Sequence, residues 1–328
     1  MRVSAALLLK HLLTRLHPPA PATARESARL LAFDRALRTG TLTVARLRSI
    51  ARHYLHQAKH RSPPAEEKLG HKLAAWLEAE DAATKSSFFL APDLVREVVP
   101  LMYADGLEST VWAWLRSLPR QAAAFLHAQD TLVSEMMRMA IRRRALDDAA
   151  AQYVAAAAYR AQSAPSEPLT SSYKRMSTAI LHKRHRHGIE PPTFDRILDH
   201  AIPFARDRVV TRGFLQLYHP ASPSADSLYR ELDDDSFVAR WNAWHSKHQM
   251  LHAALLLSVL DAAQLSLDQS KPKHAHFFLD LADKHWPDYL GASSVERVAE
   301  ASIISRLHHA RQLLASHASL AHLALAPG

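Results

Sequence analysis

The sequence predicts an all-α protein, and three observations lead to this prediction. Only seven of the 328 residues are glycine, so the backbone has few positions where a positive φ angle costs little. Alanine and leucine, which both favour helices, are abundant. Runs rich in valine, isoleucine, threonine and aromatic residues, which are typical of strands, are missing. With 48% hydrophobic and 22% charged residues, the composition is that of a globular protein.

The first 25 residues contain no acidic residue and predict a separate N-terminal element. Leucines recur at helical spacing from Leu8 to Leu16, Lys10 lies off that apolar stripe, and Pro18 follows it. A basic amphipathic helix without acids is typical of a mitochondrial targeting leader. Two alternatives stay open. One is a secretory signal, whose apolar core Lys10 would interrupt, and the other is a first core helix with its arginines in solvent.

The net charge of +9 is concentrated at the start of the chain. Residues 1–60 contain eleven lysines and arginines against only Glu26 and Asp34, which accounts for all of it. The overall charge is therefore no argument for nucleic-acid binding. Cysteine is absent, which excludes disulfides and thiolate ligands. Apolar stretches stay well short of the roughly 20 residues that cross a bilayer, so we expect no membrane span.

Prolines and glycines divide the rest of the chain into helical segments. We expect an N-terminal helical region over 26–162 and a C-terminal helical region over 168–328. The alternative, that the second continues the first, stays open. Antiparallel helical hairpins would stack into an α-solenoid-like or irregular array. The expected links are Pro63-Pro64, residues 163–168, Pro191-Pro192 and residues 219–224.

The clearest local unit is residues 91–119, where apolar residues at helical spacing lie on both sides of Gly106. This pattern predicts two antiparallel helices joined at that glycine. The tripeptide Ala75-Trp76-Leu77 recurs as Ala113-Trp114-Leu115. Its recurrence fits either a helix-pair repeat or chance in an alanine-rich chain.

The acid-free leader, the cysteine-free helical body and the hairpin sequence together resemble a known class. The hairpin runs Asp93-Leu-Val-Arg-Glu-Val-Val-Pro-Leu-Met, then Gly106, then Trp112-Ala-Trp114-Leu. Over most of its length the chain is similar to fungal mitochondrial helical-repeat proteins related to pentatricopeptide proteins. The resemblance implies a non-catalytic mitochondrial matrix protein that contacts RNA or the mitochondrial ribosome. The same class also implies an alternative, a scaffold or assembly factor for respiratory-complex subunits.

Common catalytic and cofactor motifs cannot be written on this chain. No two glycines lie close enough for a G-x-G-x-x-G or a P-loop, and G-x-S-x-G and H-E-x-x-H are missing.

Two histidine triplets each share a helical face, but their outer members lie roughly 10 Å apart, too far for one ion with Zn–N bonds of about 2 Å. We therefore expect structural histidines and assign no catalytic, cofactor or metal residue. An enzyme outside these motifs, using His with Asp, is a third hypothesis. The triplets are His53, His56 and His60, and His245, His248 and His252.

A second basic zone spans residues 138–212, with fourteen lysines and arginines against seven acids. The run from His182 to His187 places cations at a predicted helix C-terminus, where the macrodipole favours them. Such charge can neutralise phosphates, and Tyr173 could stack on a base. The alternative is a solvated helix end whose cations serve only the dipole and solubility. The candidate RNA contacts are Arg142, Arg143, Arg144, Lys174, Arg175, Lys183, Arg184 and Arg186.

Overall fold

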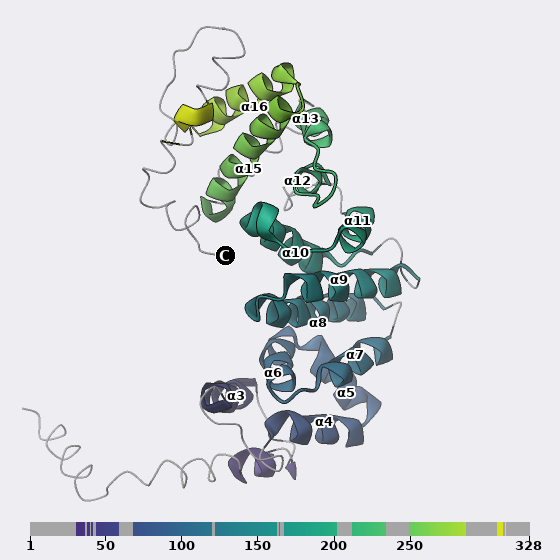
Figure 1. The fold of residues 1–328 in the computed structure, drawn as a ribbon. Helices are drawn as coiled ribbons and strands as arrows, with labels where there is room; N and C mark the ends of the chain where they lie inside the picture. Colours follow the sequence, from purple (N-terminus) through teal and green to yellow (C-terminus); the bar gives the residue numbers. More distant parts are fainter. Residues whose placement is uncertain are drawn as a thin grey trace, which may run out of the picture. The chain divides into compact units, whose positions relative to one another are not determined.

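The structure is a computed structural model in which helices joined by turns make up the described part of the chain (Figure 1). No described residue forms a strand, which confirms the all-α prediction. The predicted leader lies outside the described residues. The chain divides into two compact units, residues 1–118 and 119–328. The described residues are 31–36, 38–39, 41, 44–58, 68–119, 122–162, 164, 167–201, 212–233, 249–286, 307–310 and 312.

In the first unit, four helices pack against α6. The face of α6 that the apolar spacing predicts is fully buried, at Val95, Val98, Val99 and Met102. An ion pair between Arg48 and Glu97 (2.6 Å) joins α3 to α6. The helices of this unit are α3 (Val44–Ala58), α4 (Leu69–Ala79), α5 (Ala82–Leu90), α6 (Pro92–Ala104) and α7 (Glu108–Ser117).

Asp105, the residue after α6, joins three helices of the first unit through one buried carboxylate. Its two oxygens accept hydrogen bonds from the Tyr54 hydroxyl on α3 (2.6 Å) and from the Gly70 backbone N–H in the first turn of α4 (2.7 Å). Lys68, which precedes α4, gives no side-chain cap, so Asp105 supplies the negative charge that a helix N-terminus favours. Gly70 makes this approach possible, because a Cβ there would lie 2.8 Å from an Asp105 oxygen.

Both copies of the Ala-Trp-Leu tripeptide lie on helices of the first unit. Trp76 on α4 and Trp114 on α7 each pack edge-on against Phe88, with ring centroids 6.4 Å apart in both pairs. Phe89 also packs against Trp114. The two tripeptides therefore contribute to one aromatic cluster, and aromatic pairs of this geometry add stability beyond the burial of their area.

The second unit begins with the α8–α9 hairpin, and α10 packs against both of its helices. This packing places the helices before and after the 163–168 link in one core. The two compact units divide at Leu118–Pro119, and the expected helical regions over 26–162 and 168–328 stay a prediction. The helices of this unit are α8 (Ala123–Arg142), α9 (Leu146–Ala161), α10 (Thr170–Lys183), the 3₁₀ turn η2 (Arg184–Arg186), α11 (Pro191–Asp199), α12 (Arg212–Leu217), α13 (Asp226–Leu232), α15 (Gln249–Asp268) and α16 (Pro272–His285).

Two predicted boundaries differ from the observed ones. Pro191 and Pro192 do not form a link but begin α11, because proline needs no N–H partner in the first turn of a helix. The helix whose C-terminus we predict at His182–His187 ends early in that run, since α10 spans Thr170–Lys183. The link at 219–224 is confirmed between α12 and α13.

Three hairpins close with the same backbone turn, and each places a different residue in the left-handed conformation. In α6–α7 this residue is Gly106 (φ 77°), as predicted, but in α8–α9 it is Arg144 (φ 61°) and in α15–α16 it is Ser270 (φ 58°). In each case the next residue donates its N–H to the carbonyl five positions earlier, as Ala145 does to Ala140 (3.1 Å). This pattern is the Schellman motif, whose left-handed position usually holds glycine.

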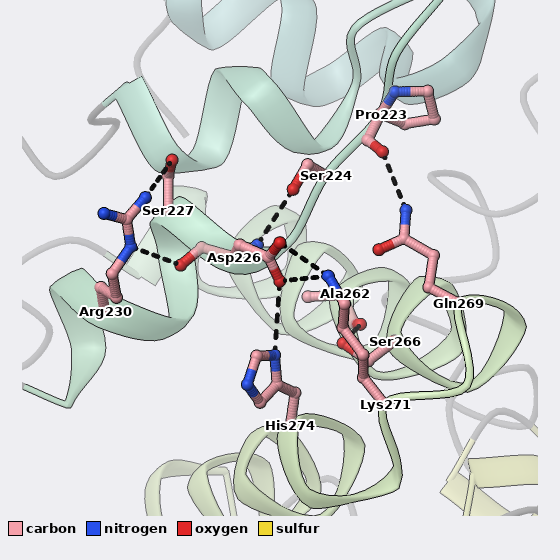
Figure 2. Close-up of polar contacts among 10 residues, drawn as sticks. All are labelled: Pro223, Ser224, Asp226, Ser227, Arg230, Ala262, Ser266, Gln269, Lys271 and His274. Carbon is pink, nitrogen blue, oxygen red and sulfur yellow. Dashed lines mark hydrogen bonds and ion pairs between the residues drawn. The ribbon is translucent and has the colours of Figure 1, made fainter.

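The α15–α16 hairpin is held to α13 by the polar contacts that Figure 2 shows. Lys271 donates to both oxygens of Asp226 (2.7 and 2.6 Å), and His274 lies 3.4 Å from the same carboxylate. Gln269 donates to the Pro223 carbonyl (3.0 Å). The regular solenoid-like order of the hairpins stays a prediction.

Candidate nucleic-acid interface

Helices α8 and α10 run in the same direction, and their side-chain contacts show it. Asp130 on α8 accepts hydrogen bonds at the start of α10 from the backbone of Ser172 (3.0 Å). One turn further along both helices, Ser134 accepts from Arg175 (2.9 Å). Because each residue advances a helix by about 1.5 Å, the two C-terminal ends, at Arg142 and Lys183, come level with each other.

A second contact confirms that the turns after these two helices are neighbours. The backbone N–H of Glu190, just before α11, donates to the Asp147 carboxylate in the first turn of α9 (3.3 Å). The structure therefore brings the Arg142–Arg144 run and the Lys183–Arg186 run to one end of the α8–α9–α10 group. We call this the basic end, and define it by Arg142, Arg143, Arg144, Lys183 and Arg186, which are all exposed.

Two features of the backbone bear on these exposed cations. Both runs begin in the last turn of a helix, where the free carbonyls favour positive charge. Arg144 also occupies the left-handed position of its Schellman motif, where a residue with a Cβ is disfavoured by about 1–2 kcal/mol. The hairpin thus keeps a cation where glycine would be less strained.

Acidic residues also lie at the basic end. Asp147 and the exposed Asp148 occupy the first turn of α9, and the exposed Glu190 precedes α11. These three carboxylates lie at helix N-termini, where the dipole favours them. The five exposed cations outnumber them, so the end keeps a net positive charge.

Arg184, a predicted RNA contact, has a structural partner instead. Its guanidinium binds both carboxylate oxygens of the buried Asp261 on α15. Although burial acts to lower the pKa of Arg184, the charge and hydrogen bond of Asp261 raise it above its ordinary value. Tyr218 donates to the same carboxylate (3.1 Å). Arg184 therefore fastens the end of α10 to α15, and we remove it from the candidate contacts.

The other predicted contacts on α10 also lie away from the basic end. Arg175 binds Ser134 and lies 3.5 Å from the buried Glu135, so it serves the α8–α10 packing. Lys174 is exposed, but nine residues before Lys183 it lies roughly 13 Å away along the helix. Tyr173, which from sequence alone could stack on a base, is buried and packs against Tyr153 instead.

The sequence reasoning missed a buried polar network that supports the basic end. The Tyr218 hydroxyl has one proton to share between the Ser258 hydroxyl (2.7 Å) and the Asp261 carboxylate. Both partners lie on α15, where all the residues from Val259 to Ala263 are buried. Polar residues in so apolar a helix were the available signal, because buried polar groups need partners.

The histidine triplets are only partly covered by the described residues. His53 and His56 lie on α3, while the side chains of the other four lie outside the described part. Among the described residues, no three His, Asp or Glu side chains gather closely enough to hold a metal ion. Of the described helices, none has both the length and the hydropathy that a membrane span requires.

Comparisons with protein-family models, with curated proteins and with solved structures find no match to this chain.

Proposed function

We propose that this chain is a non-catalytic helical protein of the mitochondrial matrix that contacts RNA, free or in the mitochondrial ribosome, through the basic end of its second unit. The observation that carries the proposal is the parallel register of α8 and α10, which brings two cationic runs, far apart in sequence, to one place. Clustered lysine and arginine side chains bind phosphates and release counterions.

The strained arginine of the α8–α9 turn supports a role beyond solubility. Arg144 holds a backbone conformation that costs free energy, and residues under such strain often lie at functional sites. The chain offers a matched comparison at Ser270, which holds the same conformation without a charge.

The decisive experiment pairs Arg144→Gly with Ser270→Gly in the full chain. Both changes relieve the same backbone strain, so both should raise the free energy of unfolding by about 1 kcal/mol. Only Arg144→Gly removes a cation from the basic end. We expect it to weaken binding of a labelled single-stranded RNA, measured by fluorescence anisotropy, and to lower the slope of log affinity against log salt by about 0.7.

Two double variants that lower the net charge equally test whether the position of the removed cations matters. Arg142→Gln with Lys183→Gln should lower the salt slope by about 1.4. Lys174→Gln with Lys273→Gln removes two exposed cations away from the basic end and should leave the slope nearer to that of the parent. Equal slopes for both double variants would refute the proposed contact.

The scaffold for respiratory-complex subunits is the competing outcome. Among the described residues, large exposed hydrophobic side chains are limited to Leu31 and Leu90, which gives that alternative little apolar surface to use. Pull-down from isolated mitochondria separates the two functions. Complex subunits that stay bound after nuclease treatment would favour the scaffold, and loss of all partners would favour RNA.

A further inference from the structure

Two buried histidines on neighbouring turns of the second unit are fixed in one tautomer by their partners. The Nε2 atom of His187 lies 2.8 Å from the Tyr218 carbonyl oxygen, which can only accept. Its Nδ1 atom lies 3.0 Å from the backbone N–H of Ile189, which can only donate. His187 must therefore be neutral, with its proton on Nε2.

His219 repeats this arrangement on the turn between α12 and α13. Its Nε2 atom lies 2.9 Å from the Asp195 carboxylate of α11. Its Nδ1 atom accepts from the backbone N–H groups of Ala221 (3.2 Å) and Ser222 (2.9 Å). Both histidines thus use an unprotonated Nδ1 to hold the backbone of the turn that follows them.

The two imidazoles share one packing partner. The ring of Phe194 on α11 is fully buried, and it lies 5.1 Å from the His187 ring and 5.2 Å from the His219 ring, between centroids. A rearrangement of either histidine would therefore disturb the packing of the other.

Protonation of His187 would act against the turn that follows it. A proton on Nδ1 of His187 would face the N–H of Ile189, so a hydrogen bond would be lost and a buried charge created. Burial lowers the pKa of His187 below its ordinary value, the hydrogen bond to Tyr218 opposes this, and the nearby His185 and His219 lower it further. The titratable groups around the site include, in the described part of the chain, Arg184 and His185 on the same turn, Asp195 on α11, Tyr218 and His219 after α12, and Asp261 on α15.

We propose that His187 forms an acid-sensitive lock, which keeps the 184–190 turn closed only while its Nδ1 atom is unprotonated. Acidification below about pH 6.5, the ordinary histidine value, would open this turn and loosen the end of α10. Lys183 precedes this turn and Arg186 lies in it, so opening would also displace two cations of the basic end. This last consequence alone depends on the proposed function.

Hydrogen exchange of the full chain, followed by mass spectrometry at pH 7.5 and 5.5 and corrected for intrinsic rates, tests the lock. Peptides covering 184–190 should open about tenfold more for each pH unit below 6.5, until the pKa of folded His187 is reached. His187→Asn keeps a neutral oxygen that can accept from the N–H two residues on, so its opening should not depend on pH. The control His127→Gln removes an exposed histidine of α8 and should behave like the parent. A parent without the acid response, or an unchanged response in His187→Asn, would overturn the proposal.

Imidazole ¹⁵N spectra of the unchanged chain keep the test decisive if the variant does not fold. We expect the Nε2–H tautomer for both histidines at pH 7.5 and a His187 midpoint below 6.5. An Nδ1–H tautomer, or a higher midpoint, would contradict the lock. Neither readout involves RNA, so a chain that binds no RNA would refute the proposed function and leave the lock standing.

Discussion

The Asp130 carboxylate on α8 caps α10 at Ser172, accepting a hydrogen bond from its backbone N–H (3.0 Å) and another from its hydroxyl (2.7 Å). The second carboxylate oxygen accepts from the N–H of Ser171 (2.7 Å). Leu169, which precedes α10, provides no side-chain cap. The first turn of α10 is thus completed by a residue about forty positions earlier, in the way that Asp105 completes α4.

Replacing Asp130 with alanine should lower the free energy of unfolding by about 2–3 kcal/mol, because a cap is lost and buried N–H groups lose their partner. Urea unfolding followed by circular dichroism measures the change. Asp148→Ala, at an exposed site in the first turn of α9, is the control and should cost less than about 1 kcal/mol. Equal losses for the two variants would show that the cap contributes little.

Replacing Gly70 with alanine should destabilise the protein by about 1–3 kcal/mol, because the new Cβ would crowd the Asp105 carboxylate. The intrinsic helix propensity predicts the opposite, a gain of about 1 kcal/mol. The sign of the change in the urea midpoint decides between the two. A more stable variant would mean that Asp105 does not lie against α4.

The Arg184–Asp261 pair should behave as one unit. Arg184→Gln removes the guanidinium from a buried carboxylate that keeps Tyr218 as a partner, and we expect a loss of about 2–3 kcal/mol. In a double-mutant cycle with Asp261→Asn, the double variant should lose about 1–3 kcal/mol less than the sum of the single changes. Additive losses would contradict the pairing.

The Asp226 carboxylate should titrate below its ordinary value of 3.8, since the hydrogen bond from Lys271 lowers its pKa. A carboxylate with a lowered pKa in the folded state adds stability above the unfolded value, and this stability is lost as the pH falls through the folded value. NMR titration of the carboxyl carbon should show the midpoint returning toward 3.8 in Lys271→Met. It should not move in Lys273→Met, which removes a nearby exposed cation. A Lys271→Met midpoint equal to that of the parent would rule out this contact.

The sequence predicted some turns and not others, and the reason is local. Gly106 indicates a left-handed turn in the sequence, because glycine adopts a positive φ without a steric cost. Arg144 and Ser270 adopt the same conformation without such a signal, because packing of the flanking helices enforces it. For the basic end, the sequence supplied the cations but not their grouping, and Arg175 and Arg184 could not be recognised as structural before their acidic partners were known.

By itself, the sequence determined the helical class, the α6–α7 hairpin and the positions of charge along the chain, since these follow from propensity, spacing and composition. The tertiary structure alone decided that α10 lies along α8, that Asp105 and Asp130 cap helices distant in sequence, and which cations remain exposed. Contacts between residues far apart in the chain depend on how one helix aligns along another. No local sequence pattern encodes this alignment.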